Sequence, residues 1–97
     1  MFVGVGKIRL HLPENQSLKG KRQVIKPIVS RVQNHFNVAI AEVGDQDLWQ
    51  VAELGISCVS DDAQHASEML TKAITFIENS RIDAEITDYE TEIISVF

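Results

Sequence analysis

The sequence predicts an α+β domain in which two helices cover one face of a single antiparallel sheet. Three observations lead to this prediction. Four segments carry the alternating or continuous apolar patterns of strands, two segments repeat apolar residues every three or four positions, and polar turns separate them. A chain of 97 residues fits one domain, so we expect a single domain over residues 1–97.

Residues 2–12 form the first predicted strand, because they alternate in the manner of a half-buried strand. The two glycines on the inward side are expected to let a helix pack close to the sheet. The inward side comprises Gly4, Gly6, Ile8, Leu10 and Leu12, and the outward side comprises Val5, Lys7, Arg9 and His11.

The first helix is predicted over residues 18–35, directly after Ser17 as the N-cap. Pro27 lies inside it, so we expect a kink there or, alternatively, a break followed by a second helix. Its apolar face comprises Leu18, Ile25, Ile28, Val29, Val32 and Phe36.

A second strand (36–44), a turn (44–47) and a third strand (48–60) follow. The third strand has an inward side with Ala52, Leu54, Ile56 and Cys58, and an outward side with Trp49, Val51, Glu53, Ser57 and Val59.

A second helix is expected after a cap at Asp61 or Asp62, and it ends at Asn79-Ser80. Its apolar stripe is Ala66, Met69, Leu70, Ala73, Ile74 and Ile77. The last strand, from Arg81 onward, is long, so a bend or bulge is expected between Asp88 and Glu90. It is expected to turn Ile82, Ala84 and Ile86 inward and Glu85, Thr87 and Tyr89 outward.

The order of these elements is βαββαβ, which is typical of the ferredoxin-like fold. Right-handed crossovers then give the strand order 4-1-3-2, with both helices on one face and the other face open. Basic and aromatic residues on such an open face are also found in sheets that bind single-stranded RNA. A cross-strand charge ladder with Glu53 and Glu85 explains the same pattern equally well.

Composition narrows the functional classes. The net charge of −5 argues against nucleic-acid binding by bulk charge, although it leaves room for a local basic patch. The single cysteine, Cys58, suits a reducing cytoplasm. No apolar run is long enough for a bilayer and no signal peptide is evident, so we expect a cytoplasmic protein without membrane contact.

Three cations crowd the predicted start of the first helix, which is the positive end of the helix dipole. They are Lys19, Lys21 and Arg22, and Lys21 falls on the inward face of the helix. Two interpretations stay open. Either Glu42, Asp45 and Asp47 neutralise the cations at the same end of the fold, or the cations receive a phosphate or carboxylate.

No catalytic, metal or cofactor site is predicted, and we expect a protein that is not an enzyme. The three histidines are scattered, and no cysteine pair exists. His11 is expected near Asp45 and Asp47, where a His–Asp pair is conceivable but a surface histidine is commoner. Cys58 is expected to be a small core residue.

Three stretches, SLKGKRQVIKP, FNVAIAEVGDQDLWQVAELG and CVSDDAQHASEML, resemble the YlxP-like family of small bacterial proteins, a domain of unknown function. The resemblance implies a ferredoxin-like fold. It also implies a link to translation, because members are typically encoded beside genes for translation and ribosome assembly. The family usually has Glu at the position of Gly20, where it would form a capping box with Ser17.

These observations lead to two functional hypotheses. The first is an accessory protein that binds RNA or a ribosomal subunit, and the second is a regulatory protein that binds an anion or small metabolite. The candidate binding residues are Lys19, Lys21, Arg22, Lys7, Arg9 and Trp49. A homodimer is also expected, formed through the open face or the apolar end segment EIISVF.

Overall fold

The computed structural model describes residues 1–80 and 83–97, and its elements follow the predicted order. Arg81 and Ile82, both assigned above to the last strand, lie outside the described residues. The elements are β1 (Phe2–His11), α1 (Leu18–His35), β2 (Ala39–Gly44), β3 (Val51–Ser60), α2 (Ala63–Glu78) and β4 (Glu85–Ser95).

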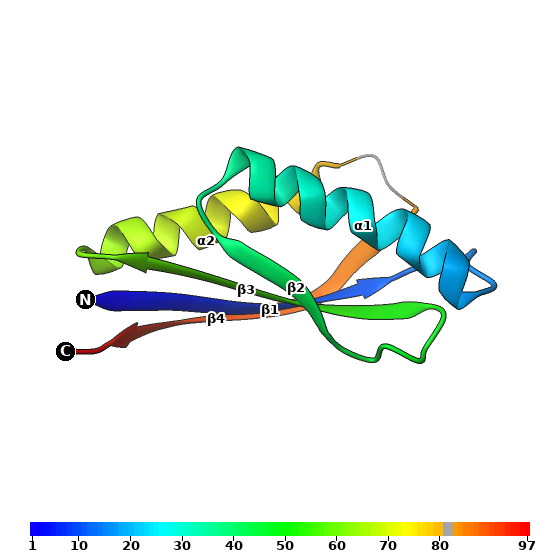
Figure 1. Ribbon diagram of the computed structural model, residues 1–97, viewed down its shortest axis with the longest axis horizontal. Coiled ribbons are helices and arrows are strands. Elements are labelled where there is room, and N and C mark those ends of the chain that lie inside the picture. The colour runs from blue at the N-terminus through cyan, green and yellow to red at the C-terminus, as the bar shows by residue number, and fades with distance from the viewer. Residues whose placement is uncertain (81–82) are drawn as a thin grey trace.

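One antiparallel sheet with the strand order β2-β3-β1-β4 carries both helices on the same face (Figure 1). The predicted ferredoxin-like fold is therefore confirmed. α2 packs on β1, β3 and β4, whereas α1 packs on β2 and on α2. The two ends of the chain lie at the same end of the sheet (Figure 1).

The core lies between the helices and the sheet, and the inward sides predicted for β1 and β3 supply much of it. Burying these side chains contributes about 25 cal/mol for each Å² of apolar surface removed from water. The largest fully buried side chains are Ile8, Leu10, Leu12, Ile28, Val32, Leu54, Leu70 and Ile77.

Both helices begin at a capping side chain. Ser17 Oγ accepts a hydrogen bond from the Gly20 amide at 3.0 Å, and Asp62 Oδ1 accepts one from the Gln64 amide at 3.0 Å. α1 is one continuous helix with Pro27 inside it, so the alternative prediction of a break at this residue is wrong.

β4 carries the expected irregularity, but it lies slightly earlier than predicted. Arg9 pairs with Asp88 and Leu10 pairs with Ile86, so Thr87 is an extra residue that has no direct partner on β1. Beyond the bulge every side chain changes face, because side chains alternate with a period of two. Tyr89 therefore lies opposite Ile8 on the helix-facing side, and its predicted outward position is wrong.

β3 is shorter than predicted, because it begins at Val51. Trp49 consequently lies in the loop between β2 and β3 and not on the open face of the sheet. The end of β4 pairs with the start of β1, and the Val96 amide donates to the Met1 carbonyl at 2.9 Å. Self-association through the open face stays a prediction, and Val3, Val59 and Ile94 form an apolar row there.

The close approach of α2 to β1 generates a prediction about Gly4. A Cβ atom at this position would lie 2.9 Å from Cys58 Sγ and 3.0 Å from Leu70 Cδ1 of α2. Gly4→Ala is therefore expected to lower the free energy of unfolding by about 1–3 kcal/mol through overpacking. Urea denaturation measures this change.

Gly55→Ala is the matched control in the middle of another strand, where a Cβ would approach the side chain of Val43. Val43 is exposed and can move at low cost, so the loss of stability there is expected to be smaller. Equal losses for the two variants would contradict the argument for helix packing.

Candidate functional site

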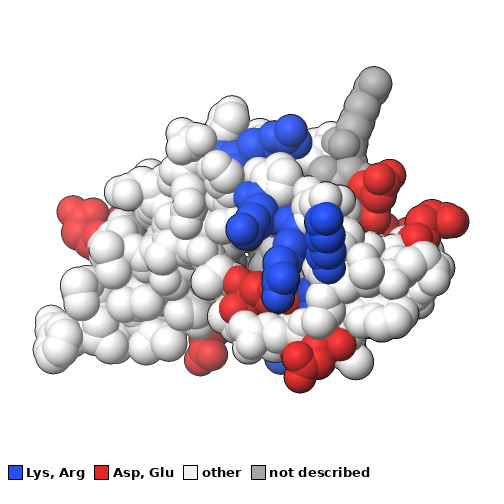
Figure 2. All heavy atoms as spheres, turned by 45° about the vertical axis from the view of Figure 1, so that its right-hand side comes forward, with Lys and Arg blue, Asp and Glu red and all other residues white. Residues whose placement is uncertain are grey.

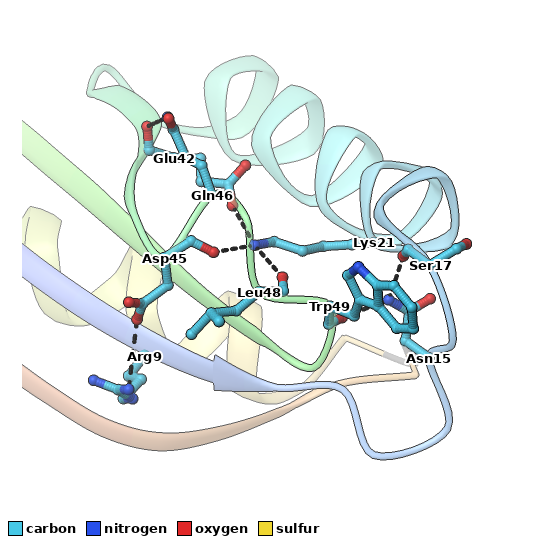
Figure 3. A network of polar contacts seen from close by, with 9 residues as sticks. All are labelled: Arg9, Asn15, Ser17, Lys21, Glu42, Asp45, Gln46, Leu48 and Trp49. Carbon is cyan, nitrogen blue, oxygen red and sulfur yellow. Dashed lines mark hydrogen bonds and ion pairs between the residues drawn. The ribbon is translucent and has the colours of Figure 1, made fainter.

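Lys21 is a buried lysine on the inward face of α1, with 2% of its surface exposed. Its Nζ lies 2.8 Å from Glu42 Oε2 of β2. The same Nζ donates to the Asp45 carbonyl at 2.7 Å and to the Leu48 carbonyl at 2.9 Å (Figure 3). The two carbonyls accept hydrogen bonds from the ammonium group and Glu42 forms a close ion pair with it, so its charge and two of its three N–H donors have partners.

The loop between β2 and β3 wraps around this ammonium group. Asp45 adopts a left-handed conformation with φ of 55°, which aspartate tolerates better than most residues. Its carbonyl accepts a hydrogen bond from the Leu48 amide at 3.0 Å as well as from Lys21. For Lys21, the geometry therefore matches the neutralisation interpretation, because its ammonium group is buried against the carboxylate of Glu42 and two carbonyls.

The cations of the open sheet face are paired with carboxylates. Lys7 Nζ lies 3.4 Å from Glu90 Oε1 and 3.5 Å from Glu53 Oε1. The hydrogen bond with Glu90 and the charge of Glu53 raise the pKa of Lys7 above its ordinary 10.5. Arg9 lies 3.5 Å from Asp45 Oδ2, so both cations are locally compensated.

His11 does not form the pair with Asp45 or Asp47 that was considered above. Its Nδ1 lies 3.4 Å from Glu85 Oε1, because β4 and not the loop after β2 is its neighbour. Asp45 pairs with Arg9 instead.

α1 carries five of the nine Lys and Arg residues of the chain and no acidic residue. Four of the five are exposed, and three of these four recur at i, i+3 and i+7, which places those three on one face of the helix. We call these three residues, Lys19, Arg22 and Lys26, the basic stripe. In Figure 2 blue side chains gather along the side of the molecule where α1 lies.

A cavity of about 330 Å³ lies beside the first turn of α1. Its lining has mixed charge, because Arg22 and Lys21 share it with Glu42 and Asp47. The carboxylate of Asp47 disfavours an anion in this cavity, whereas the outer side of the basic stripe faces solvent.

Trp49 lies beside the first turn of α1. The side chain of Asn15 donates to the carbonyls of both Ser17 and Trp49, and so joins the helix start to the loop (Figure 3). Gln50 Nε2 donates to the Pro13 and Asn15 carbonyls at 3.4 and 3.2 Å. The backbone around Trp49 is therefore held from several sides.

The six predicted binding residues fall into three settings. Lys19, Arg22 and Trp49 lie near the start of α1, Lys21 is buried beneath them, and Lys7 and Arg9 lie in ion pairs on the open face. Their roles as ligands stay predictions.

Sequence reasoning missed two contributors to this region. Lys26 was detectable, because it lies four residues after Arg22 in a helix without acids. Asn15 had no such signal, because its role depends on a loop that lies 34 residues further along the chain.

Within residues 1–80 and 83–97, no three His, Cys, Asp or Glu residues come together as a metal-binding group. Among the helices that the structure describes, none is long and apolar enough to cross a membrane.

Comparison with known proteins gives a family match over most of the chain. Residues 3–91 match the family described as "Protein of unknown function (DUF503)". The chain is also 38% identical over 90 residues to the uncharacterized protein YlxP of Bacillus subtilis (strain 168). This similarity covers 92% of the chain and 98% of the Bacillus protein.

The burial of Lys21 generates a prediction about stability. Lys21→Met keeps the length of the side chain but removes the ammonium group, which leaves Glu42 and the Leu48 carbonyl without this partner and the Asp45 carbonyl with the Leu48 amide alone. The free energy of unfolding is expected to fall by about 3 kcal/mol, as measured by urea denaturation.

Lys19→Met is the matched control, because Lys19 is exposed on the same turn and its loss is expected to change stability by less than about 0.5 kcal/mol. Adding Glu42→Gln to Lys21→Met should recover part of the loss, since the unpaired carboxylate is then neutral. Equal stability of the two lysine variants would contradict the structural role of Lys21.

Proposed function

The chain belongs to the DUF503 family of proteins of unknown function, and from its own surface we propose that it is a cytoplasmic, non-enzymatic protein that binds RNA, in particular the RNA of a ribosomal particle. The observation that carries this proposal is the basic stripe on a helix without acidic residues. Phosphate contacts supply much of the affinity of proteins for nucleic acids, so the position of the cations matters more than the net charge.

The spacing of the basic stripe suits a nucleic-acid backbone. Lys19 and Lys26 are seven residues apart, which corresponds to about 10 Å along a helix. The three side chains are exposed, and among the described residues none of them forms an ion pair. Their charges are therefore available to successive phosphates of one strand.

Lys21 has a supporting role in this proposal. It holds the carboxylate of Glu42 beneath the helix, so this acid is neutralised and does not repel phosphate at the start of the stripe. Lys7 and Arg9 are left out of the proposed interface, because Glu53, Glu90 and Asp45 compensate them.

A regulatory protein that binds a small anionic metabolite is the alternative. The cavity beside Arg22 is the nearest place for such a ligand, but the exposed carboxylate of Asp47 lines it, and Lys21 is already paired with Glu42. A rise in melting temperature with nucleotides or phosphorylated metabolites, together with no binding of RNA, would favour this alternative and contradict the proposal.

The first prediction concerns loss of the basic stripe. A variant with Lys19→Gln, Arg22→Gln and Lys26→Gln is expected to lose the measurable binding of a labelled RNA of about 12 nucleotides. Three phosphate contacts correspond to a slope of about −2 in log affinity against log salt, and this slope should approach zero in the variant. Fluorescence anisotropy measures the affinity and its salt dependence. Cosedimentation with bacterial ribosomal subunits at low and moderate salt tests binding to a ribosomal particle.

The matched control carries Lys7→Gln, Arg9→Gln and Lys72→Gln. Both triple variants remove three positive charges and change the net charge from −5 to −8. The control is expected to bind RNA like the unmodified protein. Equal weakening of RNA binding in both variants would mean that only the net charge matters. Absence of the unmodified protein from all ribosomal fractions would exclude binding to a ribosomal particle.

A change at Asp47 is expected to raise the affinity for RNA. Asp47 is an exposed carboxylate that lines the same cavity as Arg22. Asp47→Asn removes repulsion next to the basic stripe and is expected to raise the affinity for RNA about two- to fivefold, within the range of an exposed charge pair. Glu68→Gln, an equal change of charge on the exposed side of α2, is the control. Equal gains would argue against a local interface at α1.

A further inference from the structure

Trp49 is a half-exposed aromatic residue that the packing of the core does not explain. Its exposed fraction is 52%, and it is the only tryptophan of the chain. Tryptophan is rarely left in water without a partner, because its large ring favours burial and stacking.

The backbone that carries this ring is fixed. The carbonyl of Trp49 accepts from Asn15, and the preceding carbonyl of Leu48 accepts from the buried Lys21. On the other side, the Gln50 carbonyl accepts from the Leu12 amide at 2.8 Å. The exposure of Trp49 is thus not that of a frayed loop, and little conformational freedom is lost when a ligand contacts the ring.

The position of the ring relative to the basic stripe is the second observation. Asn15 donates to the carbonyls of Ser17 and Trp49, and Figure 3 shows the Trp49 ring beside Ser17, directly before the turn of α1 that contains Lys19. An aromatic ring for a base therefore lies at the end of α1 where the row of cations for phosphates begins. This combination is typical of proteins that bind single-stranded nucleic acid.

We infer that Trp49 is a stacking platform for one unpaired base of the RNA whose phosphates lie along the basic stripe. This inference rests on the proposed function, and it names the class of RNA as single-stranded or interrupted by an unpaired nucleotide. A base inside a continuous duplex is already stacked between its neighbours and presents no free face. A single base is expected, because Trp49 is the only aromatic residue in the segment between β2 and β3.

The intrinsic fluorescence of the protein tests this inference directly, since all tryptophan emission comes from Trp49. The unmodified protein is titrated at low salt with an unstructured RNA of about 12 nucleotides and with a blunt RNA duplex of equal length. The single strand is expected to quench the emission, with the same midpoint as the anisotropy of the labelled strand. The duplex is expected to bind without comparable quenching.

Variants at the ring provide a second readout. Trp49→Ala is expected to weaken binding of the single strand about tenfold, whereas Trp49→Phe keeps an aromatic face and stays within about threefold. Tyr89→Ala is the matched control, because Tyr89 has the same exposed fraction of 52% on β4. Circular dichroism and urea denaturation establish that each variant is folded.

The possible failures are distinguishable. If the single strand binds through the basic stripe but neither quenches Trp49 nor depends on it, the inference is overturned and the proposed function stands. Equal quenching by the duplex overturns the assignment to unpaired bases. If no RNA binds in the anisotropy measurement, both the proposed function and this inference fail.

Discussion

The ammonium group of Lys21 is the interaction on which the candidate interface depends. Burying a cation costs several kcal/mol unless its charge and its donors are compensated, and here one carboxylate and two carbonyls compensate them. These acceptors come from the end of β2 and from the loop before β3. A single side chain of α1 therefore fixes the path of the loop that carries Trp49 and places the carboxylate of Asp45 near Arg9.

The charges of the molecule are segregated by element. α1 has basic and no acidic residues, whereas β4 has Glu85, Asp88, Glu90 and Glu92 and no basic residue. Because of the bulge at Thr87, all four of these acids lie on the open face of the sheet, on the opposite side from the helices. This separation of charge leaves α1 as the side for the proposed binding of RNA in a protein with a net charge of −5.

Periodicity predicted the fold well because the sheet buries one face and each helix buries one stripe. The same reasoning placed Lys21 on the inward face of α1 and near Glu42 and Asp45, as observed. It failed at Tyr89, because one inserted residue reverses the alternation and nothing in the local pattern marks Thr87 as that residue. It also failed at Trp49, where an apolar side chain extended the strand pattern although its backbone belongs to a loop held by Asn15 and Lys21.

Gly20 in the first turn of α1 affects both the start of the helix and the contacts of Asn15. In a helix, glycine lowers the propensity by about 1 kcal/mol relative to alanine. In this chain a Cβ at Gly20 would collide with Asn15 Oδ1, so glycine leaves the space in which Asn15 reaches both Ser17 and Trp49. Its absence of charge also keeps the first turn of α1 free of acid. Glycine at this position therefore leaves room for the contacts of Asn15 and places no negative charge at the start of the basic stripe, which suits the proposed binding of RNA phosphates.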